Sequence, residues 1–242
     1  MRKLVIIFLS IFLLSQVSHA QIDESHTFVY LNNDKVDYSD SIWLLNGEVI
    51  KKSNNRKFHK MEEIRFINAE NGFFSNTLNI GSRRSPLLAK RTIKGDINLF
   101  ESQTIYVENG YAPGAVQGGL FTKKKYYNYF NKGYETLKPV SYKALYPLFS
   151  KNHESMVYLD KYRSANIYEH AFIVAEWGFY ASSVYLGIRS VNNNSNSSLV
   201  KSSLLPFGAL LTGYGMRLVS NWFGAKKNEH LHEAFINYDG IK

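Results

Sequence analysis

The chain has 242 residues, a formal net charge of +9 and no cysteine. The missing cysteines exclude a disulfide framework, a thiolate zinc site, a cysteine nucleophile and the lipid anchor of a bacterial lipoprotein. The basic excess is spread along the chain, which is typical of a solvated surface, and nucleic acid is not an expected partner.

The first twenty residues have the three parts of a secretory signal peptide. Arg2 and Lys3 give a positive start, Leu4–Leu14 is an apolar run, and Ala20 is a small residue at the expected cleavage site. The run is shorter than the ~20 apolar residues that a membrane-spanning helix needs. We expect export and cleavage before Gln21, with the mature protein in the periplasm-facing cell envelope; an uncleaved anchor is the alternative.

Residues 21–138 carry strand signals separated by turn residues, and they predict a β-rich domain. The Ile64/Phe66 alternation indicates one buried strand face. We expect a loop over residues 81–92 and a glycine-rich loop over Asn109–Gly119, and about eight short strands in a small antiparallel sheet or barrel-like domain. The clearest expected strands are Thr27–Leu31, Ser41–Leu45, Glu48–Lys52, Lys57–Ile67, Phe73–Asn79, Thr104–Val107 and Lys124–Asn131.

Residues 139–242 predict a helical region, so the fold class is α+β with the β-rich domain first. Ser141 can cap a short helix over Tyr142–Phe149, and Asn152 can cap a longer one. The tail Lys226–Tyr238 predicts an amphipathic helix. Its apolar face is formed by Leu231, Phe235 and Tyr238.

Two apolar segments, Ala171–Ile188 and Ser203–Phe223, are each long enough to cross a bilayer as a helix. Each contains one charge, Glu176 or Arg217, and the polar linker Arg189–Lys201 separates them. We expect a helix hairpin that contacts membrane lipid through 171–223; if the hairpin spans the membrane, export places its linker on the cytoplasmic side. A hairpin buried in a soluble protein has the same apolar content, and Glu176 weakens the membrane interpretation. Both interpretations stay open.

The best metal-like cluster lies in the tail helix, with weak candidates Glu229, His230, His232 and Glu233. Zinc binding on a helix favours two imidazoles three or four residues apart, whereas His230 and His232 are two apart and point to different sides. A solvated helix face is the better interpretation, and we expect no metal and no cofactor.

Catalytic patterns are weak. Asp96, Asp160 and Glu176 form a hydrolytic pair only if the fold brings two of them within about 5–10 Å. His153 and Ser155 are near in sequence, which does not establish triad geometry. His59 precedes two glutamates on an expected strand. We therefore predict no catalytic residue.

Tyrosines on the last expected strand, Tyr126, Tyr127 and Tyr129, are candidates for a binding surface together with the Asn109–Gly119 loop. A sheet whose alternate residues pack inward is the alternative.

Four stretches, TFVYLNNDKV, TIKGDINLF, the run from YYNYFNKGYE to YLDKYR, and HLHEAFINYD, occur in this order. Their order resembles a loosely defined group of uncharacterised exported envelope proteins of Bacteroidota-type bacteria. The resemblance covers most of the mature chain and implies a β-rich domain, an apolar helical pair and a short tail helix. It implies no activity. One departure is Asp34, where a glycine turn is more usual.

These patterns together predict an exported envelope protein that is a non-catalytic, membrane-anchored binding or structural module. Its expected partner is an envelope protein or polymer. The alternatives are a periplasmic hydrolase acting on envelope polymers and a soluble periplasmic structural protein.

Overall fold

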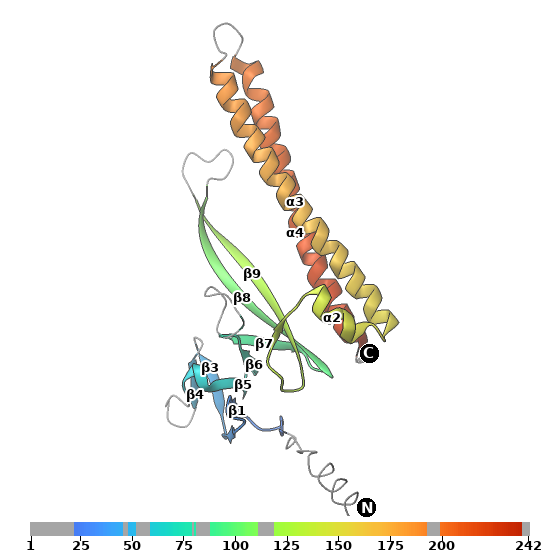
Figure 1. Cartoon of the computed structure of the whole chain (residues 1–242). Coiled ribbons are helices and arrows are strands. Elements are labelled where there is room, and N and C mark those ends of the chain that lie inside the picture. Colours follow the sequence, from blue (N-terminus) through green and yellow to red (C-terminus); the bar gives the residue numbers. More distant parts are fainter. Residues whose placement is uncertain are drawn as a thin grey trace, which may run out of the picture. The chain divides into compact units, whose positions relative to one another are not determined.

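The computed structural model describes residues 22–45, 48–51, 59–78, 80, 88–110, 119–192 and 199–238. The expected signal peptide, residues 1–20, lies outside this range. An antiparallel eight-stranded sheet precedes a long helical region, which confirms the α+β class (Figure 1).

The strands of the main sheet pair with antiparallel neighbours. The sheet has the order β10-β9-β8-β7-β6-β5-β1-β2, and β3 pairs with β4 in a separate two-stranded sheet. The elements are β1 (Phe28–Leu31), β2 (Val36–Tyr38), β3 (Ile42–Leu45), β4 (Glu48–Lys51), η1 (Met61–Glu63), β5 (Ile64–Ala69), β6 (Gly72–Asn76), β7 (Leu88–Ile93), β8 (Ile97–Gly110), β9 (Gly119–Lys132), β10 (Lys138–Pro139), α2 (Tyr142–Phe149), α3 (His153–Asn192) and α4 (Leu199–Tyr238).

Several strand expectations are corrected. Strand β7 occupies part of the stretch expected to be a loop over 81–92, and the rest of that stretch lies outside the described residues. Strand β5 starts only at Ile64, because a 3₁₀ turn precedes it. Strands β8 and β9 have 14 residues each, so residues 109, 110 and 119 of the expected glycine loop belong to strands.

The turn after β1 uses Asp34 in the left-handed region, with φ of 62°. This conformation favours glycine, and aspartate is among the few other residues that tolerate it. The Asp34 carboxylate accepts hydrogen bonds from the Tyr30 hydroxyl at 2.8 Å and from Arg65 at 3.0 Å. These bonds hold the turn without the glycine that the resemblance implied.

The chain divides into two compact units. The first holds residues 1–91 and 100–127, and the second holds residues 92–99 and 128–242. The expected boundary after residue 138 stays a prediction.

Both faces of β5 are covered in the first unit. Phe66 contacts the rings of Phe73 and Phe100, while Ile67 belongs to an aliphatic cluster that includes Ile42 of β3. The expectation of one buried face is therefore wrong, because β3 contributes apolar side chains to the second face.

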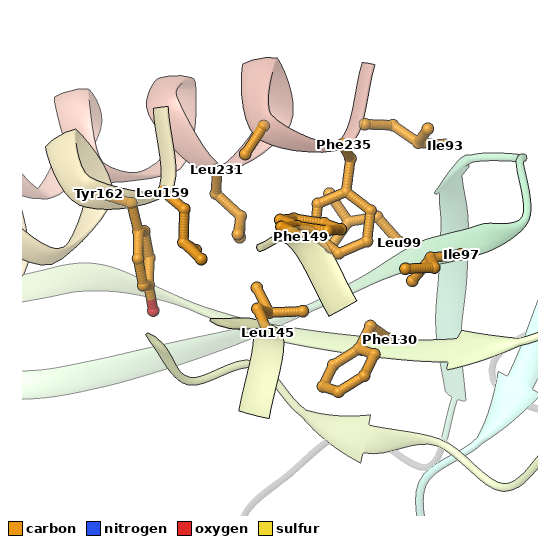
Figure 2. Close-up of a cluster of buried hydrophobic side chains, with 11 residues drawn as sticks. Ile93, Ile97, Leu99, Phe130, Leu145, Phe149, Leu159, Tyr162, Leu231 and Phe235 are labelled. Atoms are coloured by element: carbon orange, nitrogen blue, oxygen red, sulfur yellow. The ribbon is translucent and has the colours of Figure 1, made fainter. Parts of the chain in front are cut away.

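The second unit is built around a core at the base of α3 and α4. Figure 2 shows Phe149 of α2 against Phe235 of α4, with ring centroids 5.1 Å apart and nearly perpendicular planes. Leu159 and Tyr162 of α3 join them. The strands contribute four residues to the same cluster: Ile93, Ile97, Leu99 and Phe130.

Asn152 fixes the start of α3 as expected. Its side-chain oxygen accepts a hydrogen bond from the Ser155 amide at 3.1 Å, which caps the helix. Its amide nitrogen donates to the carbonyls of Asn237 at 3.1 Å and Tyr238 at 3.4 Å. One side chain therefore joins the first turn of α3 to the last turn of α4.

Helices α3 and α4 run side by side as an antiparallel hairpin, and each has 40 residues (Figure 1). At 1.5 Å per residue each is about 60 Å long. The apolar segment Ser203–Phe223 and the amphipathic tail are parts of one continuous helix. Pro206 consequently lies inside α4 and not in its first turn, because the helix begins at Leu199.

Candidate membrane-contact surface

The distal hairpin, which we define as residues 171–188 of α3 and 204–222 of α4, exposes a large apolar surface. Exposed fractions of its large hydrophobic side chains run from 37% at Val219 to 72% at Val174. Soluble monomers seldom expose contiguous apolar patches beyond a few hundred Å². The exposed set is Val174, Trp177, Val184, Tyr185, Ile188, Leu204, Leu205, Phe207, Leu211, Tyr214, Leu218, Val219 and Trp222.

One helix among the described residues is long and apolar enough to cross a membrane by length and composition. Residues His153–Ser190 contain an 18-residue window with mean hydropathy 1.3, of which 11% is buried. The low buried share is unlike that of a helix at the centre of a soluble core. No such window is found in the described residues of α4, whose apolar stretch is interrupted by Pro206, Arg217 and Asn221.

The two charges of the distal hairpin pair with each other. Arg217 donates from Nε and Nη2 to Oε1 of Glu176, at 2.7 and 2.6 Å. The Glu176 side chain is only 7% exposed, whereas that of Arg217 is 41% exposed. Glu176 weakened the membrane interpretation as an isolated charge, and this pairing removes much of that objection.

Apart from that pair, the distal hairpin is uncharged on its outer faces. The exposed positions of α3 between Ala171 and Ile188 hold only aliphatic, aromatic, glycine, alanine or serine residues. Those of α4 between Leu204 and Trp222 add one threonine and one asparagine. A helix hairpin in water typically carries charged residues on its solvent side, and the exposed positions between these bounds carry none.

Hydroxyl groups in the middle of the hairpin are satisfied within the protein. Ser182 donates to the Gly178 carbonyl at 2.8 Å, and Thr212 donates to the Gly208 carbonyl at 2.9 Å. Ser183 reaches across to the Pro206 carbonyl at 2.8 Å. Side chains that bond to helix carbonyls need no water, which is the arrangement that a hydrocarbon environment requires.

Close packing of the two helices depends on Gly213. A Cβ atom at this position would lie 2.6 Å from Cε1 of Tyr180 and 3.3 Å from Cβ of Phe179. The Tyr180 ring therefore lies against the backbone of α4. Small residues at helix contacts are typical of membrane hairpins and allow such close approach.

An aromatic collar, which we define as Tyr168, Phe172, Trp222 and Phe223, lies where the apolar segments end. Ring centroids of Phe223 lie 5.1 Å from Tyr168, 5.6 Å from Phe172 and 4.8 Å from Trp222. Charged residues begin beside the collar. They form the ion pairs Glu169–Lys227 and Lys226–Glu229.

The three candidate tyrosines of β9 differ in exposure. Tyr126 is 51% exposed, and Tyr127 is partly buried under the Lys125 ammonium, which lies 5.0 Å from its ring centroid. Tyr129 is 3% exposed, so it does not belong to an exposed surface. It lies in the paired end of β9, opposite Pro139 of β10. Most of the candidate loop at 109–119 lies outside the described residues.

The candidate metal residues contact different partners. Glu229 pairs with Lys226 at 2.7 Å, and His230 lies against the Tyr158 ring with centroids 6.5 Å apart. Burial is the main cause that lowers the pKa of His230. His232 and Glu233 are half-buried on the same helix. Within the described residues no group of three or more metal-binding side chains comes together.

The catalytic candidates also have other partners. Asp160 accepts a hydrogen bond from Tyr142 at 2.7 Å, and Glu176 binds Arg217. Both carboxylates are on α3, sixteen positions and so about 24 Å apart, which is too far for a hydrolytic pair. Ser155 is fully buried, and its hydroxyl has no hydrogen-bond partner.

His59 has two acidic neighbours. Its Nε2 lies 2.7 Å from Oδ2 of Asp37, and its Nδ1 lies 3.9 Å from Oε2 of Glu63. The Asp37 contact was not foreseen, because Asp37 in β2 and His59 before the 3₁₀ turn are 22 positions apart in sequence.

Sequence reasoning missed the Glu176–Arg217 pair, although a signal for it was present. The two residues lie at nearly equal distances from the polar linker, so an antiparallel hairpin places them opposite each other. The aromatic collar was not foreseen either, because its rings come from both helices and meet only when the helices pack.

No family model, no curated protein and no solved structure matches this chain.

Proposed function

We propose that this chain is an exported cell-envelope protein that the distal hairpin anchors in a lipid bilayer. In this proposal the sheet acts as a non-catalytic binding or structural module. The observation that carries the proposal is the outer face of the hairpin, which is apolar along both helices while its two charges neutralise each other.

Magnitudes favour lipid over water as the surroundings of this face. Removing a large apolar side chain from water is favourable by about 1.5–3 kcal/mol, and thirteen such side chains are partly exposed here. Even at half of that value each, the total is on the order of 10 kcal/mol. An unpaired charge in mid-bilayer costs about 2.5–3.5 kcal/mol on insertion scales, and pairing reduces this cost.

The sequence supports export. The apolar run with Arg2 and Lys3 before it and Ala20 after it is typical of a signal peptide, and the chain has no cysteine for lipid attachment. Without a lipid anchor, its own apolar surface or its partners are left to hold the protein in the envelope, and the distal hairpin favours the apolar surface. The partner of the sheet is an envelope protein or polymer, for which the exposed Tyr126 beside Lys125 provides an aromatic and basic contact.

Fractionation tests the anchor. The full chain is expressed in a bacterium with a cell envelope, and its membranes are washed with high salt and then with carbonate at high pH. We expect the protein to stay in the pellet until detergent is added. Release by either wash, or recovery in the soluble periplasmic fraction, contradicts the proposal.

A double variant and a matched control test whether the exposed face of the hairpin is surrounded by lipid or by water. Val174→Lys with Val184→Lys adds two charges at side chains that are 72% and 63% exposed. Water tolerates this change, but a bilayer penalises it by about 2.5–3.5 kcal/mol per charge near its centre. We expect loss of carbonate resistance. Val157→Lys, at a 39% exposed position of α3 outside the distal hairpin, is the control and is expected to behave as the wild type.

A further inference from the structure

The aromatic collar marks a sharp change in the character of the hairpin. Trp222 is 56% exposed and Tyr168 is 52% exposed, so the collar presents amphipathic rings to the surroundings. On the side of the unit-2 core, the Glu169–Lys227 pair follows within about one helical turn. Tryptophan and tyrosine collect at the level of lipid headgroups, where one part of the ring is apolar and the other is hydrated.

The length of hairpin beyond the collar fits a whole bilayer. From Phe172 to the end of α3 at Asn192 the helix rises about 30 Å, and from Leu199 to Phe223 of α4 about 36 Å. The hydrocarbon core of a bilayer is about 30 Å thick. A hairpin inserted to the collar therefore brings the far ends of both helices to the opposite headgroup layer.

The far end of α3 is polar. Arg189 is exposed and is the first charged residue after Glu176 on this helix. By sequence, residues 193–198 are only asparagine and serine. A hairpin that dipped into one leaflet would leave these groups in hydrocarbon, where unsatisfied polar groups cost several kcal/mol each.

We infer that the hairpin crosses the bilayer completely, with the collar in the headgroup layer beside the unit-2 core and Arg189 in the opposite headgroup layer. This inference rests on the proposed function and adds the depth and the two-sided topology of the anchor. The alternatives are a hairpin that enters one leaflet only and a hairpin that lies flat on the membrane.

Because the chain has no cysteine, single-cysteine variants report one position each. Lys161→Cys lies on the side of the collar where the unit-2 core is, Ala181→Cys lies near mid-bilayer, and Ser190→Cys lies at the far end of α3. All three are on the same helix. The full mature chain is added to preformed phosphatidylethanolamine–phosphatidylglycerol vesicles and floated on a density gradient, and then treated with a membrane-impermeant maleimide.

The expected result is asymmetric labelling. Most Lys161→Cys molecules react in intact vesicles, and Ser190→Cys reacts mainly after the vesicles are opened without dissolving the bilayer. Ala181→Cys reacts about tenfold or more slowly in both conditions, because a thiolate does not form in hydrocarbon. In detergent all three react.

Each other outcome overturns the inference in a recognisable way. Equal labelling of Lys161→Cys and Ser190→Cys in intact vesicles means that the hairpin lies on one side. Protection of Ser190→Cys in opened vesicles means that the tip stays in the hydrocarbon. Failure of the protein to float with the vesicles overturns the proposed function itself and not only the crossing.

Quenching of tryptophan fluorescence gives an independent measure of how deep the hairpin lies in the bilayer. The chain has three tryptophans, and Trp43→Phe leaves Trp177 and Trp222 in the hairpin. Removing one of these in turn gives single-tryptophan proteins. We expect Trp222 to be quenched most by bromine near the headgroup and Trp177 by bromine deeper in the acyl chain. The opposite order contradicts the placement of the collar.

Discussion

Arg217 binds Glu176 through two donors on a single carboxylate oxygen, at 2.6 and 2.7 Å, between two helices that otherwise present only uncharged side chains over this length. The pair joins residues 41 positions apart. It holds the register of α3 against α4, and it balances the charge of the distal hairpin.

The pair is expected to show strong coupling. Arg217→Leu leaves a carboxylate that is nearly buried, and breaking a buried pair in this way costs about 3–5 kcal/mol. Glu176→Leu leaves an arginine that is more exposed and should cost less. The double variant Glu176→Leu with Arg217→Leu should recover most of the loss, since replacing a buried pair with apolar residues is often neutral.

The measurement is thermal unfolding of the purified protein in detergent, followed by circular dichroism as a double-mutant cycle. Additive losses in the double variant contradict the pair. A carbonate wash of membranes from the same strains checks whether the Arg217→Leu protein also inserts less completely.

The approach of Tyr180 to Gly213 predicts that this glycine tolerates no side chain. Gly213→Ala places a methyl 2.6 Å from the Tyr180 ring, and overpacking of this kind costs about 1–3 kcal/mol. Gly215→Ala is the control, because a Cβ there meets nothing within 4 Å. It should be neutral or stabilising by up to about 1 kcal/mol, because alanine favours helix more than glycine does.

Melting in detergent compares the two alanine variants directly. If the approach is as close as described, Tyr180→Ala combined with Gly213→Ala should lose less than the sum of the two single changes. Equal melting temperatures for the Gly213→Ala and Gly215→Ala proteins would contradict the contact.

Asn152 has two roles that substitution can separate. Asn152→Ala removes both the cap of α3 and the bonds to the end of α4, and losing a cap alone costs about 0.5–2 kcal/mol. Asn152→Asp keeps a capping oxygen and adds negative charge at the helix N-terminus, which is favourable, but it lacks the amide donor.

We therefore expect the alanine variant to be the least stable and the aspartate variant to be intermediate. Amide hydrogen exchange over residues 234–238 should rise in both variants, because both lose the bonds to Asn237 and Tyr238. Unchanged exchange there in the aspartate variant would show that these bonds contribute nothing.

The lowered pKa of His230 predicts that the free energy of unfolding falls in mild acid. Its pKa is lowered, first by burial, so the unfolded chain binds a proton more readily than the folded one. Stability from this group is therefore complete above the unfolded pKa of about 6.5 and falls as the pH drops below it. The charged groups that act on this histidine are Lys161, Lys226, Glu229 and Glu233.

Melting temperatures measured from pH 7.5 to pH 5 test this expectation. The slope between pH 6.5 and pH 5.5 should be smaller for His230→Gln than for the wild type. The control variant is His153→Gln, because His153 is exposed and this change leaves His230 in place. A wild-type slope in the His230→Gln protein would show that other groups cause the acid sensitivity.

Local sequence signals predicted the helical half well. Ser141 and Asn152 cap helices as expected, and the apolar segments pair across a polar linker. Leu231 and Phe235 turn toward the core, as their spacing indicated. Capping and helical periodicity act within a few residues of each other, so the chain itself carries this information.

The strands were predicted less completely. Strands β3 and β4 lie where Ser41–Leu45 and Glu48–Lys52 were expected, and β1, β5 and β6 lie near their expected places. Strand β7 was missed because LAKRTI has a mixed pattern that only pairing with a neighbour makes extended. Strand β10 is two residues long and exists because it pairs with β9.

The sequence alone determined the α+β order, the helix caps and the two apolar segments, because each depends on residues that are neighbours along the chain. The tertiary structure decided that Tyr129 is buried, that both faces of β5 are covered and that Glu176 meets Arg217. These outcomes depend on contacts between distant residues, whose partners are set only when strands pair and helices pack. The exposed apolar face of the hairpin, and with it the case for a lipid bilayer, follows from that packing.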